Sequence, residues 1–228
     1  MSKLERLYRT SESSKLSNLV LLADGLLSIS AEYGCEASGE LRDSEVFVYY
    51  RNCSVGEDLF ELEELEERGL EIHLIDGFGG KDAGSLLEEA REPAVRVLNE
   101  LRQYAPLTYM TGTEYALLVL RTGEVYIAEG GFGKVVLPYI KEVILEAHTH
   151  PGACLPSARD CSEIAARFMD GLYAGGIISM GCTLLVYRVG PLMEEDVETL
   201  MRLHQVLGEN PTFSQVKLGS IRVEILIP

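Results

Sequence analysis

The second half of the chain carries hydrophobic patterns that predict a sheet with covering helices. "EYALLVLRTGEVYIAE" (114–129) predicts two strands that turn at Thr122-Gly123. "VVLPYIKEVILEAHTH" (135–150) ends in a further strand, and "SARDCSEIAARFMDGLYAGG" (157–176) repeats apolar residues every four positions, as one face of a helix does. The remaining segments predict a strand in "ISMGCTLLVYRVG", a helix in "EEDVETLMRLHQVLG" and a closing strand in "SIRVEILIP".

The first hundred residues alternate between strand and helix patterns. In chain order they predict a strand at 45–52, a helix at 56–69, a strand at 70–76 and a long helix at 83–105 that kinks at Pro93. The segment 13–34 fits either a helix or a pair of strands, because Gly25 interrupts a stripe of apolar residues. Such alternation is typical of a small α/β unit with parallel strands.

Charge is distributed unevenly along the 228 residues, whose formal net charge is −16. Residues 1–100 carry 10 Lys/Arg against 22 Asp/Glu, whereas residues 101–228 carry 10 against 14. We therefore expect an acidic α/β domain of unknown role at 1–105 and a second domain at 106–228. A chain this acidic is not expected to bind the phosphate backbone of a nucleic acid.

The composition is that of an ordinary soluble globular protein, with 46% hydrophobic and 25% charged residues. The opening "MSKLERLYRTSESSK" lacks the apolar region of a secretion signal, and the uncharged run at 171–187 is too short and too polar to cross a bilayer. We expect a cytoplasmic protein with no membrane partner. Five scattered cysteines without a CxxC pair argue against a disulfide scaffold and against a Cys-rich zinc site.

Candidate chemistry is concentrated in "EAHTHPGACLPSARD" (146–160), which holds two of the four histidines. His148 and His150 lie two residues apart, so on a strand their side chains leave the same face. Asp160 follows a short loop and could supply a third ligand, and three protein ligands are what a catalytic zinc site uses. The sequence therefore predicts a metal centre at this point.

The polar motifs also allow other interpretations. Taken alone, Ser157 and Asp160 are a typical helix capping box. The loop "DGFGGKDAGS" (76–85) fits neither a P-loop nor the dinucleotide pattern GxGxxG, and is best explained as a turn. No HExxH motif occurs, and the signature of the zinc-dependent nucleobase deaminases is also missing.

The sequence "HTHP…PSARD" resembles the zinc motif of the JAMM (MPN+) metalloprotease family, in which a distant Glu precedes HxHP and S-x-x-D. The resemblance covers about residues 105–207. It implies an α/β MPN domain of cytidine-deaminase-like fold with a mixed sheet, here preceded by the small acidic α/β domain. It also implies one Zn²⁺ per chain, with His148, His150 and Asp160 as ligands.

The same resemblance assigns two catalytic residues. Ser157 would support the tetrahedral intermediate, and Glu114 in "EYALLVL" would be the catalytic glutamate. The implied activity is that of a zinc-dependent metallo-isopeptidase or peptidase that cleaves after the C-terminus of a ubiquitin-like protein or its conjugate. One alternative is release of an amino acid from a ubiquitin-like sulfur-carrier protein, and another is a non-catalytic MPN scaffold that binds a protein partner.

Glu146 competes with Glu114 for the role of general base. Glu146 lies two residues before His148 on the same face, on the side away from His150, so we expect it to orient His148 instead. The zinc loop is one residue shorter than in the family pattern. Cys154 within that loop is expected to be a small filling residue, although a fourth ligand or an inhibitory thiolate are alternatives.

Overall fold

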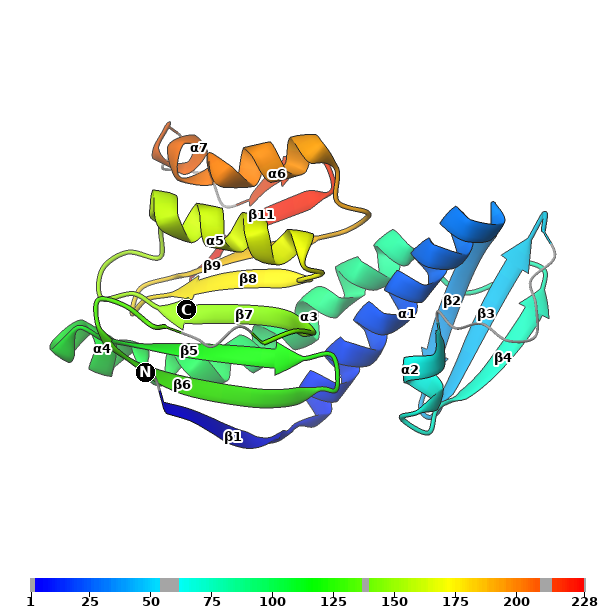
Figure 1. Cartoon of the computed structure of the whole chain (residues 1–228), viewed down its shortest axis with the longest axis horizontal. Helices are drawn as coiled ribbons and strands as arrows, with labels where there is room; N and C mark the ends of the chain where they lie inside the picture. The colour runs from blue at the N-terminus through cyan, green and yellow to red at the C-terminus, as the bar shows by residue number, and fades with distance from the viewer. Residues whose placement is uncertain (1–2, 54–61, 137–139, 210–214, 228) are drawn as a thin grey trace.

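The chain is a mixed α/β protein. Its computed structural model describes residues 3–53, 62–136, 140–209 and 215–227, and these residues form seven helices, an eight-stranded mixed sheet and a three-stranded sheet (Figure 1). The predicted helix at 56–69 lies partly outside the described residues. The part that is described forms the short helix α2 (Glu63–Glu66).

The large sheet has the strand order β1-β6-β5-β7-β8-β9-β11-β10. Strands β7 and β8 are parallel, and all other neighbouring pairs are antiparallel. Its strands are β1 (Lys3–Arg9), β5 (Thr113–Leu120), β6 (Glu124–Phe132), β7 (Val143–Thr149), β8 (Ala174–Ile178), β9 (Thr183–Arg188), β10 (Gln215–Leu218) and β11 (Ile221–Leu226).

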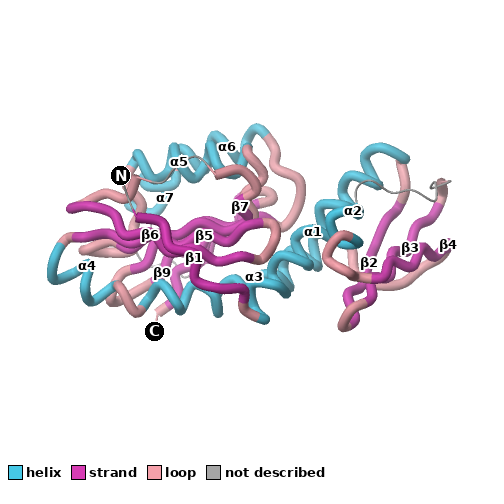
Figure 2. The backbone as a smooth tube through the Cα atoms, turned by 60° about the horizontal axis from the view of Figure 1, so that its bottom comes forward, coloured by secondary structure: helices cyan, strands magenta, loops and turns pink. Residues whose placement is uncertain are grey.

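Helices cover both faces of this sheet. One face carries α5 (Ala158–Met169), α6 (Glu194–Met201) and α7 (Leu203–Glu209), and the other carries α1 (Ser11–Tyr33) and α3 (Ala83–Arg102), as Figures 1 and 2 show. The short α4 (Ala105–Thr111) lies at one end and leads directly into β5.

Side-chain alternation along β5 separates two cores. Leu117 and Val119 pack into the core on the α1 and α3 side, whereas Leu118 packs into the core that includes Phe168 of α5. Residues at even positions of β5 therefore face α5. The same face of the sheet receives the candidate metal ligands.

The ambiguous segment 13–34 is a helix for nearly its whole length. Thr10 caps the N-terminus of α1 in a capping box with Ser13, and Gly34 ends the helix in a left-handed conformation at φ 65°. Because α1 is buried on several sides, apolar residues occur all round it, and this weakens the helical periodicity in the sequence.

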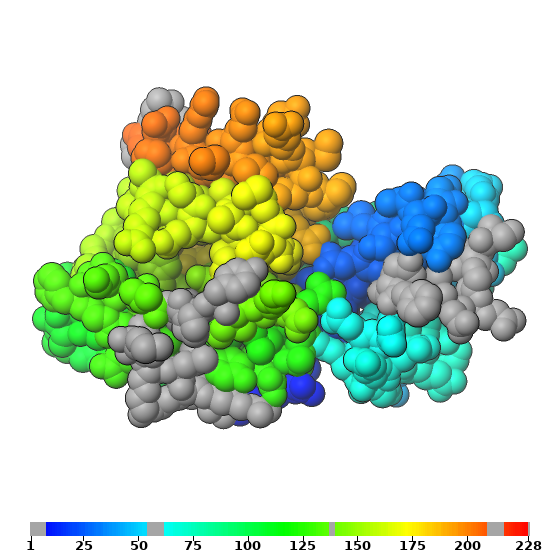
Figure 3. Space-filling model, in the orientation of Figure 1, coloured from blue at the N-terminus to red at the C-terminus, as the bar shows by residue number. Residues whose placement is uncertain are grey.

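The small sheet, in the order β2-β3-β4, packs on the ends of α1 and α3 that extend beyond the large sheet (Figure 1). Its strands are β2 (Glu36–Arg42), β3 (Glu45–Arg51) and β4 (Glu71–Asp76), with β3 and β4 parallel. Gly39 in β2 lies so near Leu22 and Leu26 of α1 that a Cβ there would be 3.1–3.3 Å from their methyl groups. Figure 3 shows the resulting lobe beside the large sheet.

The change in charge near residue 105 does not coincide with the division between the sheets. Strand β1 pairs with β6 in the large sheet, and residues of α1 and α3 share one hydrophobic core with β5 and β7. The large sheet is therefore built from both sides of the expected domain boundary. Charge density follows exposed surface, and it carries little information about which elements share a core.

Several elements differ from the sequence predictions. The helix predicted at 157–176 ends at Met169, because the chain turns at Gly171 with φ 96° and β8 begins at Ala174. Strands β1, β2 and β10 were not predicted. Of the helices in the described ranges, none is long and apolar enough to cross a membrane.

The cysteine pattern argued against a disulfide scaffold, but two disulfides are present. Cys35 pairs with Cys53 across the edge of the small sheet, and Cys154 pairs with Cys182 beside the candidate metal centre. Cys161 is a free thiol buried in the α5 core. Because the partners lie 18 and 28 residues apart, no local motif such as CxxC marked them.

Candidate metal centre

The two histidines are positioned by the end of β7. His148 lies opposite Ala116 of β5, and His150 follows the last strand residue, with its backbone N–H donating to the carbonyl of Ile178 at 2.8 Å. Strand-like backbone at this point directs both imidazoles to the face covered by α5. Their Nε2 atoms lie 3.0 Å apart.

The carboxylate comes from the first turn of α5. Ser157 caps this helix: its hydroxyl accepts from the Asp160 N–H at 3.2 Å, and the Asp160 Oδ2 accepts from the Ser157 N–H at 2.7 Å. The capping box expected as the plain interpretation of this motif is therefore present. It also fixes the carboxylate so that it faces both histidines. Asp160 can therefore be a helix-capping residue and a candidate metal ligand at the same time.

These three side chains form a compact set of ligand atoms. Asp160 Oδ1 lies 3.5 Å from His148 Nε2, and Asp160 Oδ2 lies 3.5 Å from His150 Nε2. In a tetrahedral zinc site with bonds of about 2.0–2.1 Å, neighbouring donor atoms are about 3.3 Å apart. The observed spacings of 3.0–3.5 Å fit that requirement, so the group could hold a metal ion.

The electrostatics favour the ligand forms of two of these groups. Burial alone would raise the pKa of the Asp160 carboxyl, but hydrogen bonds from His148 and Ser157 hold that pKa well below its usual range. Burial, aided by the neighbouring His148, lowers the pKa of His150. Asp160 is therefore ionised and His150 neutral near pH 7, as metal ligands must be.

Glu114 lies in β5 beside the histidines. Because Ala116 pairs with His148 in an antiparallel register, Glu114, two residues earlier, is on the same face and level with His150. Its side chain is only 8% exposed, and burial raises the pKa of the carboxyl, with the Asp160 charge adding to the rise and His148 opposing it.

A single cavity of about 910 Å³ joins these residues. The chemically important part of its lining comprises Glu114, Glu146, His148, His150, Ser157 and Asp160. The structure thus brings together every site residue that the sequence suggested. The expected contact between Glu146 and His148 is replaced by another one, since Glu146 Oε2 accepts from Arg167 Nε at 2.7 Å.

A disulfide bond anchors the loop between His150 and Asp160 to the turn between β8 and β9. Cys154 is buried and bonded to Cys182, which belongs to the turn between β8 and β9. The Cys154 N–H also donates to the Cys182 sulfur at 3.3 Å. As a disulfide sulfur, Cys154 is neither a fourth ligand nor an inhibitory thiolate, and both of those alternatives are excluded.

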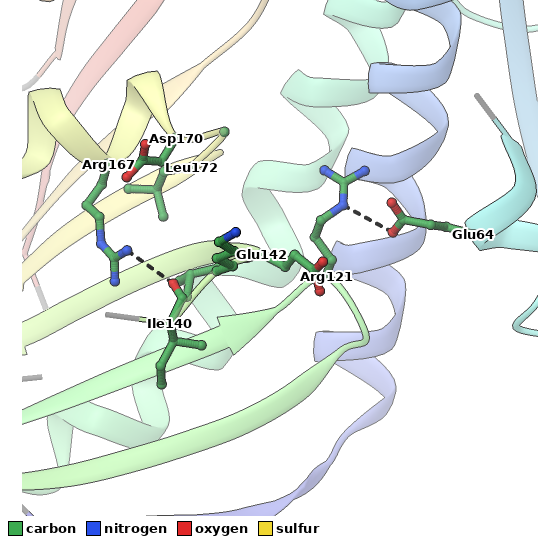
Figure 4. Close-up of a pocket in the computed structure, with 10 residues that line it drawn as sticks. Glu64, Arg121, Ile140, Glu142, Arg167, Asp170 and Leu172 are labelled. Carbon is green, nitrogen blue, oxygen red and sulfur yellow. Dashed lines mark hydrogen bonds and ion pairs between the residues drawn. The ribbon is translucent and has the colours of Figure 1, made fainter. Parts of the chain in front are cut away.

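A second cavity of about 330 Å³ shares Arg167 and Asp170 with the first (Figure 4). It lies where Glu64 of α2 faces the turn after β5 and the end of α5. Two of its charged groups are engaged within the lining: Arg121 contacts Glu64 at 3.1 Å, and Arg167 donates to the Ile140 carbonyl at 3.2 Å. It contains no histidine, and we assign it no role.

Sequence reasoning missed Arg167, Cys182 and Thr149 as parts of the site. Arg167 lies seven residues after Asp160, which is two helical turns along the same face of α5, and this spacing was a usable signal. Cys182 had no such signal, because its partner depends on the turn between β8 and β9. The buried contact of Thr149 with Thr108 depends on α4, which was not predicted.

Comparisons of the chain with protein-family models, with curated proteins and with solved structures found no significant match.

Proposed function

We propose that this protein is a zinc-dependent peptidase or isopeptidase of the JAMM (MPN+) type, acting after the C-terminus of a ubiquitin-like protein. The observation that carries the proposal is the triangle of His148, His150 and Asp160 ligand atoms, with Glu114 in the same cavity. The mixed sheet with helices on both faces is compatible with a cytidine-deaminase-like MPN domain. The sequence motif supplies the family assignment.

When bound, zinc would lower the pKa of a coordinated water and polarise the scissile carbonyl. Glu114 takes the proton from the attacking water and delivers it to the leaving amine. Its raised pKa suits both steps, because a carboxyl that binds a proton more readily is a better base and still returns the proton to an amine. Its place on β5, beside the histidine strand, lets it reach the open side of the site.

Ser157 contributes a hydroxyl at the mouth of the same cavity. In this proposal its O–H donates to the oxyanion, while its oxygen accepts from the Asp160 N–H in the capping box. The cavity of about 910 Å³ is large enough for several residues of an extended chain. An extended C-terminal tail is the simplest substrate of that shape.

The first test of this proposal is metal content. Elemental analysis of the purified chain should give about one zinc per molecule, removed by a chelator and restored by added zinc. A preparation that holds no zinc after careful purification would favour the non-catalytic scaffold.

The second test is cleavage of two kinds of substrate. One is a ubiquitin-like protein joined to a lysine side chain, and the other is a ubiquitin-like sulfur carrier with one extra C-terminal amino acid. Cleavage of the first supports the isopeptidase, and cleavage of the second alone selects the carrier-processing peptidase. Failure to cleave either, with zinc bound, contradicts the substrate class.

A further inference from the structure

Thr149 stands between the two histidines and faces the opposite side of the sheet. It is fully buried, and so is Thr108 of α4. Their hydroxyl oxygens lie 2.7 Å apart and share a hydrogen bond. The Thr149 oxygen also accepts from the backbone N–H of Tyr115 at 2.9 Å.

This second bond extends the pairing of β5 with β7 by one residue. The backbone register between these strands runs up to Ala116 opposite His148. At the next residue, the Thr149 side chain continues the pairing, because its hydroxyl oxygen accepts a hydrogen bond from the Tyr115 N–H. Tyr115 follows Glu114 directly, so this contact acts next to the carboxylate on β5 and between the two histidines on β7.

The other neighbour of β5 does not fix Glu114 in the same way. Pairing with β6 slips by one residue between Thr113 and Tyr115, at the position of Glu114. Such irregularities loosen the pairing locally and often redirect a side chain. The hydroxyl of Thr149 therefore bonds to the backbone directly beside Glu114 from the β7 side, where the register is regular from Ala116 to Val119.

Thr108 completes the arrangement from the chain that precedes Glu114. Helix α4 ends at Gly112, whose left-handed φ of 71° turns the chain into β5. The bond from Thr108 to Thr149 ties this helix to the end of the histidine strand. The short stretch that contains Glu114 is thus held at both ends, by the hydrogen bond between Thr108 and Thr149 before it and by the bond from the Tyr115 N–H to Thr149 after it.

We propose that Thr149 and Thr108 are positioning residues that set the place of Glu114 relative to His148 and His150. This inference rests on the proposed function, in which Glu114 moves the proton. Neither threonine lines the cavity. Their buried hydroxyls act by fixing the backbone of β5 against that of β7.

The test replaces Thr149 with valine, which keeps the shape and removes the hydroxyl, and with serine, which restores it. In Thr149→Val, the Tyr115 amide should exchange with solvent at least about 10-fold faster, because its acceptor is gone. Zinc content should remain one per chain. Turnover should fall about 10- to 100-fold with KM unchanged, since a displacement of about 1 Å at a catalytic group has that effect. Thr149→Ser should recover turnover.

Two further variants serve as controls. Ser17→Ala removes an equally buried hydroxyl, which donates to the Arg121 carbonyl far from the site, and should leave kcat unchanged. Thr108→Val keeps the Tyr115 bond, so the Tyr115 amide should stay protected from exchange, while turnover falls by a smaller factor than in Thr149→Val with KM unchanged. It also decides the question if Thr149→Val does not fold.

Full turnover in Thr149→Val despite a fast-exchanging Tyr115 amide would overturn the inference. So would a loss that Thr149→Ser does not repair. If the wild-type chain cleaves no substrate, the proposed function fails separately. The cobalt-loaded protein then decides the positioning role: a changed paramagnetic NMR shift at Glu114 in Thr149→Val supports it, and an unchanged shift contradicts it.

Discussion

Two groups of histidine and acidic side chains with metal-ligand spacing occur in the described parts of the chain, one on each sheet. On the large sheet the group is His148, His150 and Asp160. On the small sheet His73 Nε2 lies 3.2 Å from Glu45 Oε1 and 3.8 Å from Glu71 Oε1. The donor spacings are similar, so spacing alone does not distinguish the two groups.

Their surroundings differ. The side chains on the large sheet are 13–20% exposed and line a cavity, whereas His73, Glu45 and Glu71 are 32%, 47% and 73% exposed on an open sheet face. Exposed carboxylates remain hydrated and mobile, so ordering them around an ion has an entropic cost. A capping box and a disulfide already hold the ligands of the large sheet in place.

Preorganisation, more than ligand type, therefore distinguishes the candidate metal centre on the large sheet from the group on the small sheet. Of the two groups, the one on the large sheet shares its cavity with Glu114. This carboxylate is not one of the three candidate ligands, and burial raises its pKa. A binding site can be made of ligands alone, but hydrolysis also needs such a proton carrier.

The largest expected effect comes from breaking the ligand set of the large sheet. His148→Ala or Asp160→Asn should abolish stoichiometric zinc binding and reduce hydrolysis to background, because two ligands do not hold the ion in an open site. Metal analysis and a cleavage assay measure both quantities. Retention of one zinc per chain by either variant would show that the ion binds elsewhere.

Next in size is the loss of the proton carrier. Glu114→Gln should keep zinc and fold while hydrolysis falls about 10²-fold or more, whereas Glu146→Gln, which loses its ion pair with Arg167, should retain most activity. A base must be deprotonated, so wild-type kcat/KM should decline as the pH falls through the raised pKa of Glu114. The residual activity of Glu114→Gln should lack that decline. The opposite result, with Glu146→Gln inactive, would reverse the roles.

Much of this site could be predicted because its signals are local. The spacing of His148, His150 and Asp160 sits within thirteen residues, and strand and helix periodicities place them correctly. Glu114 required only that its strand be a neighbour of the histidine strand, which the family resemblance implied. These features depend on short stretches of chain, in which residue spacing and periodicity already indicate the local structure.

The missed features depend on distant partners. Strand β1 is defined by its pairing with β6, more than a hundred residues away, and its own pattern is weak. The bond between Cys154 and Cys182 depends on the turn between β8 and β9, which brings the two residues together. No periodicity reports such contacts, because they arise from tertiary packing.

The two disulfides allow a matched comparison with an intermediate effect. Replacing either pair by serines should destabilise the fold by about 2–4 kcal/mol. Only Cys154→Ser/Cys182→Ser should also weaken zinc binding, by about 10-fold, because it frees the loop between two ligands. Cys35→Ser/Cys53→Ser is the control. Denaturant unfolding and zinc competition measure the two quantities, and equal zinc affinities in both variants would remove the proposed role of the loop anchor.

The smallest expected effect lies on the small sheet. His73→Ala removes a half-exposed hydrogen-bond contact with Glu45, so the free energy of unfolding should change by less than about 1 kcal/mol. The ring also stacks on Phe47 at 4.8 Å, so His73→Phe should retain that packing and separate it from the contact with Glu45. Zinc content and hydrolysis should stay at wild-type levels in both variants, because neither group reaches the cavity of the large sheet. A second zinc per chain in the wild type, lost in His73→Phe, would show instead that exposure does not prevent this group from binding metal, and the distinction drawn between the two sheets would fail.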